Sequence, residues 1–90
     1  MHALLVRVTI QDFDRGREFL TTQVVPRVSQ APGFVAGYWA RTEDNRGRSM
    51  AVFESEEAAR AVKEIIEANA GENDGVTLEG VEVAEVVASA

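Results

Sequence analysis

The first ten residues are mostly apolar and β-branched and contain no turn residue, a pattern that predicts a β-strand. This strand runs from His2 to Ile10, and its alternate residues form two faces that are both largely apolar. The polar residues Gln11–Asp14 end the strand. We expect Asp12 or Asp14 to cap a following helix by accepting hydrogen bonds from its free N–H groups.

The second predicted element is an amphipathic helix, because apolar residues recur at intervals of three and four. This stripe consists of Phe19, Leu20, Val24, Val25 and Val28. Pro26 lies within the stripe. Since proline removes one backbone hydrogen bond and clashes with the preceding turn, we expect a kink or a break into two pieces. The helix is predicted to end at Ala31-Pro32-Gly33.

Two more strands, Phe34–Thr42 and Arg48–Glu54, are predicted on either side of the polar hairpin loop Glu43–Gly47. Tyr38 and Trp39 are neighbours in the first of these strands, so their side chains point to opposite faces of the sheet. We therefore expect one of the two rings to border the helices and the other to lie on the opposite face.

A second helix is predicted after Ser55, a suitable N-cap, with Glu56 and Glu57 in its first turn, where the helix dipole favours anions. Its expected apolar face consists of Ala58, Val62, Ile65, Ile66 and Asn69. An exit loop, Gly71–Gly75, precedes a last strand from Leu78 to Ala88.

The resulting order, βαββαβ, predicts one domain over residues 1–90 with the α+β, ferredoxin-like fold. In this fold a four-stranded antiparallel sheet carries both helices on one face. The strands are apolar on both faces, which indicates burial on both sides. Because a short chain without disulfides builds only a small core, we expect the sheet of a second copy to cover the open face in a homodimer.

Composition and charge restrict the functions that this domain can have. The sequence has 15 acidic and 9 basic residues, a net charge of −6, so we expect no nucleic-acid partner. It has no cysteine, which excludes disulfides, thiolate metal sites and thiol nucleophiles. No apolar run is long enough to span a membrane and no cleavable signal is evident at the start, so we expect a cytoplasmic protein without a membrane partner.

Three segments carry a resemblance to a known group of proteins: Ala31-Pro32-Gly33-Phe34, Gly37-Tyr38-Trp39 and the strand-to-helix junction Val52–Ala59. Together with the βαββαβ order, they resemble the dimeric α+β-barrel superfamily and, within it, the antibiotic-biosynthesis-monooxygenase-like domain. The resemblance covers essentially the whole chain. It implies two subunits packed sheet to sheet, each with a cavity between its sheet and helices. The enzymes of the group include cofactor-free oxygenases of phenols and quinols, haem-degrading enzymes and isomerases.

The resemblance also implies that haem-degrading members carry an Asn on the first strand and a Trp and a His around the second helix. Here the first strand has Arg7 and Thr9, and residues 55–75 contain neither Trp nor His. The only histidine, His2, makes no His-based metal site by itself. We therefore expect neither a cofactor nor a bound metal.

Few side chains are candidates for chemistry. Trp39 and Tyr38 can stack on an aromatic substrate or fill the core. Arg41 and Arg7 place a charge on an apolar strand face, where it must be paired or lie at a rim. Either arginine can hold the anionic oxygen of a phenolate or carboxylate, or form an ion pair between strands or subunits. His2 is the one imidazole available as a general base.

Two functions are consistent with these residues. The first is a cofactor-independent monooxygenase acting on a small aromatic or quinol substrate; an isomerase would require His2 as its base. In the oxygenase, the residues expected to take part in the reaction are Trp39, Arg41 and His2. Those expected to bind the substrate are Tyr38, Arg7 and Phe53. The alternative is a non-catalytic ligand-binding or interaction domain, which a core filled by phenylalanines would favour over an open cavity.

Overall fold

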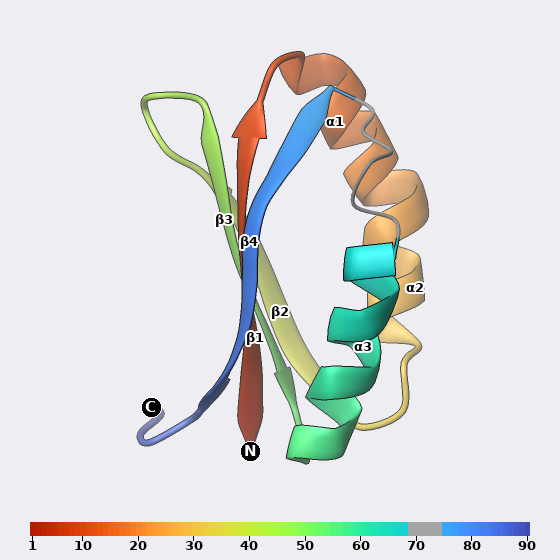
Figure 1. Ribbon diagram of the computed structural model, residues 1–90, viewed down its shortest axis with the longest axis vertical. Coiled ribbons are helices and arrows are strands. Elements are labelled where there is room, and N and C mark those ends of the chain that lie inside the picture. Colours follow the sequence, from red (N-terminus) through yellow and green to blue (C-terminus); the bar gives the residue numbers. More distant parts are fainter. Residues whose placement is uncertain (69–74) are drawn as a thin grey trace.

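Four strands form one antiparallel sheet, and the helices lie together on one side of it (Figure 1). The computed structural model describes residues 1–68 and 75–90. The strands are β1 (His2–Ile10), β2 (Phe34–Arg41), β3 (Arg46–Phe53) and β4 (Val76–Glu85). Their order across the sheet is β2-β3-β1-β4. The predicted ferredoxin-like fold is therefore confirmed.

The first helical region is irregular, as Pro26 predicts, but it has three parts where we expected a kink or two pieces. The three parts are α1 (Phe13–Phe19), a π-helical turn η1 (Leu20–Val24) and α2 (Val25–Ser29). Asp12 is the N-cap of α1, and its carboxylate accepts a hydrogen bond of 3.1 Å from the backbone N–H of Arg15.

The π turn is explained by the missing N–H of Pro26 and the bulk of its ring, which prevent a regular helical hydrogen bond to the preceding turn. The N–H of Val25 donates instead to the carbonyl of Leu20, five residues earlier. The hydroxyl of Thr22 donates to the carbonyl of Glu18 at 2.7 Å. The regular α-helix is thus interrupted before Pro26, as expected. The backbone stays helical through the π turn, so the side chains of α1 are rotated about the helix axis relative to those of α2.

The second helix, α3 (Glu56–Ala68), begins where the sequence predicts, because the hydroxyl of Ser55 accepts a hydrogen bond from the N–H of Ala58. Its expected apolar face is only partly right. Val62 is buried, but Ile65 is 61% exposed because it borders an open cavity. Asn69 and residues 71–74 of the predicted loop lie outside the described residues.

The limits predicted for the last two strands are wrong. The hairpin loop is shorter than expected, because β3 already begins at Arg46. The hydroxyl of Thr42 bonds to Asp44 and to the backbone of Arg46, and Asn45 adopts a positive φ of 58° that completes the turn. The last strand begins at Val76, two residues before the predicted start, and ends at Glu85, three residues before the predicted end.

A small core lies between the sheet and the helices, near the start of β1 and the end of β3. Leu4 and Phe53 are fully buried there. The ring of Phe53 meets that of Phe34 edge to face, with centroids 5.9 Å apart. The other buried members of this cluster are Val28, Ala51, Ala59 and Val62. None of the helices in the described part of the chain is long and apolar enough to cross a membrane.

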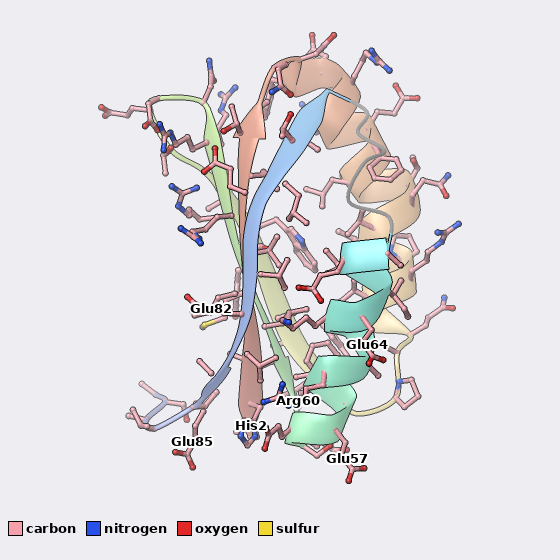
Figure 2. All side chains as sticks on the ribbon, viewed as in Figure 1. His2, Glu57, Arg60, Glu64, Glu82 and Glu85 are labelled. Carbon is pink, nitrogen blue, oxygen red and sulfur yellow. The ribbon has the colours of Figure 1, made fainter. Side chains whose placement is uncertain are left out.

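The opposite face of the sheet has no helix over it (Figure 1). The register places Tyr38, Met50, Leu5 and Glu82 in one row across the four strands. Tyr38 is 70% exposed and Met50 is 42% exposed. Figure 2 shows Glu82 on this side of the sheet, away from the helices. The row is therefore apolar except for Glu82 at its end, in keeping with the predicted second apolar face.

The core analysis predicts that Phe53→Ala destabilises the fold by about 3–5 kcal/mol, because it removes the largest fully buried side chain and leaves a cavity. Urea denaturation followed by circular dichroism at a fixed protein concentration measures this change. Val87→Ala is the control, because Val87 is 88% exposed, and we expect a change within about 0.5 kcal/mol. Equal stability of the two variants would contradict the assignment of the core.

Candidate functional site

A half-open cavity of about 730 Å³ lies between the inner face of the sheet and the helices. All four strands and all parts of the helical layer contribute to its lining, which is mainly apolar. Strand β1 contributes Val6, Val8 and Ile10, which alternate along its inner face. The core and the cavity both lie between the sheet and the helices. Side chains fill this space at the core end of the molecule and leave it partly open at the cavity end.

Trp39 forms part of the floor of this cavity. Its indole ring lies against the backbone of Gly37, where a side chain would collide with the ring. The side chain of Val8 lies against Gly47 in the same way, where a Cβ atom on Gly47 would collide with it. These two glycines allow large inner-face side chains to lie along the sheet, which leaves space above them.

Arg41 lies at the rim, where the end of β2 meets the start of α1. Its guanidinium carbon is 3.7 Å from the centre of the Phe13 ring, a cation–π contact. Both residues line the cavity, as do Arg17 on α1 and Arg27 on α2. The charged lining residues are arginines, and no aspartate or glutamate in the described part of the chain is among them.

Three basic residues away from the cavity have acidic partners. Arg46 pairs with Asp44 at 3.2 Å, Arg60 with Glu56 at 2.7 Å, and Lys63 with Glu67 at 3.1 Å. The hydrogen bond from Thr42 lowers the pKa of Asp44. Among the described residues, no carboxylate pairs with Arg17, Arg27 or Arg41 of the cavity lining. The cavity therefore presents positive charge at its rim in a protein of net negative charge.

His2 lies at the far end of the sheet, outside the cavity lining. Its Nε2 atom is 4.0 Å from the carboxylate of Glu56, and its Nδ1 atom is buried without a hydrogen-bond partner. Figure 2 shows His2 at the end of the molecule where Arg60 and the first turn of α3 lie. The hydrogen bond from Arg60 lowers the pKa of Glu56, so this carboxylate is ionised at neutral pH.

The structure brings together two of the six candidate residues, Trp39 and Arg41, in the cavity. Tyr38 and Arg7 are on the opposite face of the sheet, where the Arg7 side chain lies across Gly80. Phe53 is buried in the core and does not line the cavity. With His2 at the far end, these four residues lie apart from the Trp39–Arg41 pair.

Sequence reasoning missed Phe13 and Arg17, because the predicted apolar stripe started at Phe19. A signal was available, since Phe13, Arg17 and Leu20 follow one another at intervals of four and three. An arginine within such a stripe is usual at the edge of a helix face, because its aliphatic stem packs while the charged end stays in water. The stripe identifies the helix face, and only the structure shows the space beneath it.

No protein-family model matches the chain, and no curated protein matches it. Solved structures of the same fold do match over its whole length. The heme-degrader MhuD from Mycobacterium tuberculosis, solved with two hemes bound in its active site, is 22% identical with a TM-score of 0.61, covering 100% of this chain and 99% of its own. A MhuD point mutant with two manganese protoporphyrin IX molecules per active site is 21% identical with a TM-score of 0.65. This match covers 100% of this chain and 98% of that chain.

A third similar structure is a dimeric ferredoxin-like protein from an uncultured marine organism. It is 14% identical with a TM-score of 0.62, and the match covers 99% of this chain and 97% of that protein. At these levels of identity the likeness concerns the fold. The resemblance to the antibiotic-biosynthesis-monooxygenase-like domain is thus confirmed at the level of the fold.

The cavity does not offer the donors that a haem would require. Haem iron is held in proteins by His, Cys, Met or Tyr side chains. None of these residue types is among the lining residues in the described part of the chain. Both the sole histidine and the sole tyrosine lie elsewhere, His2 at the far end and Tyr38 on the opposite face. The lining therefore does not fit an iron porphyrin held through its metal.

If the cavity is accessible to solvent, the hydrophobic dye ANS will bind to the folded protein and its fluorescence will increase. Ser49 lines the middle of the cavity beside Trp39, so Ser49→Phe fills the space and is expected to abolish this signal. Cooperative urea unfolding of both proteins serves as the control for loss of structure. Undiminished dye binding by a well-folded Ser49→Phe variant would contradict the assignment of the cavity.

Proposed function

We propose that the protein is a cofactor-independent monooxygenase that binds a small aromatic or quinol substrate in the cavity between its sheet and helices. The observation that carries this proposal is the apolar, half-open cavity with the indole of Trp39 on its floor and the guanidinium of Arg41 at its rim. The fold shared with a heme-degrading enzyme supports oxidative chemistry, and the lack of an iron ligand among the described lining residues supports chemistry without haem.

Trp39 and Arg41 have separate tasks in this proposal. The indole offers a flat apolar surface on which an aromatic ring can stack. The guanidinium holds the phenolic oxygen of the substrate and favours its deprotonated form, because a nearby positive charge lowers the pKa of an acid. The apolar lining excludes water, which strengthens this interaction and protects the reactive anion.

The anionic substrate then reacts directly with O₂. A methylene group activated by the aromatic system loses a proton to solvent at the mouth of the cavity, and oxygen adds to the carbon to give a hydroperoxide. Loss of water from the hydroperoxide leaves a carbonyl, so that R₂CH₂ and O₂ become R₂C=O and H₂O. A quinol reacts at a ring carbon by the same balance, so that the quinol and O₂ become a hydroxyquinone and H₂O. The protein contributes positioning, a dry site and a positive charge.

A second candidate, a non-catalytic ligand-binding domain, is favoured by a separate observation. The described lining contains no His, Asp, Glu, Lys or Tyr side chain that could act as a general base. In this case the same cavity binds the same class of molecule, and the bound ligand does not turn over. The two candidates therefore differ in the reaction and agree on the site.

Oxygen uptake with an anthrone and with a hydroquinone tests the oxygenase. We expect uptake above the uncatalysed rate, and Trp39→Phe and Arg41→Ala are each expected to reduce it by about tenfold or more. Arg60→Ala is the matched control, because Arg60 lies on the outer side of α3 in a pair with Glu56. Binding of these compounds without uptake would favour the second candidate, and uptake unchanged in both cavity variants would contradict the site.

We also propose that the open sheet face binds a second copy of this chain. On this face the exposed side chains of Tyr38, on the edge strand β2, and Met50, on β3, lie side by side, and one of the similar structures is a dimeric protein. It carries both signs of charge, since Arg7 and Arg48 are paired across the strands and Glu82 lies in the next row. A two-fold arrangement can place the carboxylate of each copy near the guanidiniums of the other, which relieves the repulsion between the arginines.

The dimer proposal predicts that the protein sediments as a dimer at low micromolar concentration. Met50→Asp places a charge at the centre of the open face and is expected to yield monomers. Val87→Asp introduces the same charge at an exposed site beyond β4 and is expected to leave the dimer intact. A wild-type monomer at these concentrations would refute the proposal.

A further inference from the structure

Two arginines that line the cavity have no acidic partner among the described residues, and their placement suggests what the ligand carries. We infer that Arg17 and Arg41 form a carboxylate clamp, so that the ligand is an amphipathic carboxylic acid with its apolar body in the cavity and its carboxylate between the two guanidiniums. This inference rests on the proposed function, in that it requires the cavity to be the ligand site, and it specifies the class of molecule that binds there.

Phe13 links the two arginines, since it contacts Arg41 directly and lies one helical turn from Arg17. Arg41, at the end of β2, stacks on the Phe13 ring at 3.7 Å. Arg17 lies one helical turn after Phe13 on α1, and residues at this spacing are neighbours on a helix surface, about 5–6 Å apart at their Cβ atoms. Phe13, Arg17 and Arg41 all line the cavity. Arg17 therefore lies on the same helix surface as Phe13, whose ring holds the Arg41 guanidinium at the rim before a ligand binds.

No carboxylate in the described part of the chain neutralises the charge of Arg17 or Arg41 through an ion pair. Nearby carboxylates exist on α1, because Asp12 caps the helix and Asp14 lies in its first turn. Neither of them forms an ion pair with Arg17 or Arg41. Two like charges side by side at the edge of an apolar cavity are unfavourable in the free protein. An anion placed between them removes this repulsion and gains attraction from both.

The shape and polarity of the site favour a carboxylate on an apolar body over other anions. A guanidinium matches the two oxygens of a carboxylate with a planar fork of N–H donors. The cavity behind the clamp offers few polar side chains besides arginines, chiefly Gln23 and Ser49. A sugar phosphate would leave its hydroxyl groups without partners there, which is costly. At about 730 Å³, the cavity has room for a molecule of several fused rings.

Isothermal titration calorimetry with naphthoate and with its neutral isostere naphthamide tests the clamp. Both probes have the same apolar body, so they differ in the charge that the clamp would recognise. We expect naphthoate to bind at least about tenfold more tightly than naphthamide, since hydrogen bonds to charged groups are the stronger ones. Arg17→Gln and Arg41→Gln are each expected to weaken naphthoate binding by about tenfold and to change naphthamide binding by less than about twofold.

Arg60→Gln is the matched control and should change neither affinity, because Arg60 lies outside the cavity. Equal binding of the two probes, or naphthoate binding unchanged by Arg17→Gln, would overturn the clamp while leaving the cavity as a ligand site. Failure of both probes to bind would overturn the clamp and the proposed function together. Selective binding of naphthoate without any oxygen uptake would support the clamp and contradict the oxygenase.

Discussion

The fully buried side chains of Phe53 and Leu4 form the centre of the core at one end of the molecule, where the Phe53 ring also meets that of Phe34. This cluster holds the end of β3, the start of β2 and the start of β1 together, and α3 packs on it through Ala59 and Val62. Beyond it the side chains are too small, or too far apart, to close the space. The cavity, its rim and the candidate chemistry therefore depend on a core that occupies only part of the interface between the two layers.

The fold and the function are separable in this molecule. The architecture is shared with a heme-degrader that binds two hemes, yet the lining described for this chain offers arginines where an iron porphyrin would need a metal ligand. The same arrangement of strands and helices can thus enclose chemically different sites. What distinguishes this site is the contrast between a net charge of −6 and a rim at which Arg17 and Arg41 have no partner among the described carboxylates.

Much of the backbone follows from local rules in the sequence. Asp12 and Ser55 cap their helices as expected, and Pro26 interrupts the helix as its chemistry requires. Alternation also shows that Tyr38 and Trp39 must point to opposite faces, but it does not say which face lies under the helices. That choice depends on Gly37, which has no side chain to block the indole, and on long-range packing that a local pattern does not contain.

The site was harder to predict than the fold, because it is formed where packing is incomplete. Ile65 fits the helical stripe, but it borders open space, so its position in the pattern gave no sign of its exposure. Arg17 belongs to α1 and Arg41 to β2, and their common neighbour Phe13 is separated from Arg41 by the rest of the first helical region and most of β2. The contact between Phe13 and Arg41 depends on how the whole chain folds, so a local sequence pattern does not predict it.

The π turn at Leu20–Val24 has a consequence for how this chain can change during evolution. Each residue added to or removed from a helix rotates the part before it by about 100° relative to the part after it. Loss of a single residue from this turn would remove the extra residue of the π turn and rotate Phe13 and Arg17 relative to α2 and the sheet. Relatives that differ in length by one residue at this point would then retain the architecture and present a different helical surface to the interior.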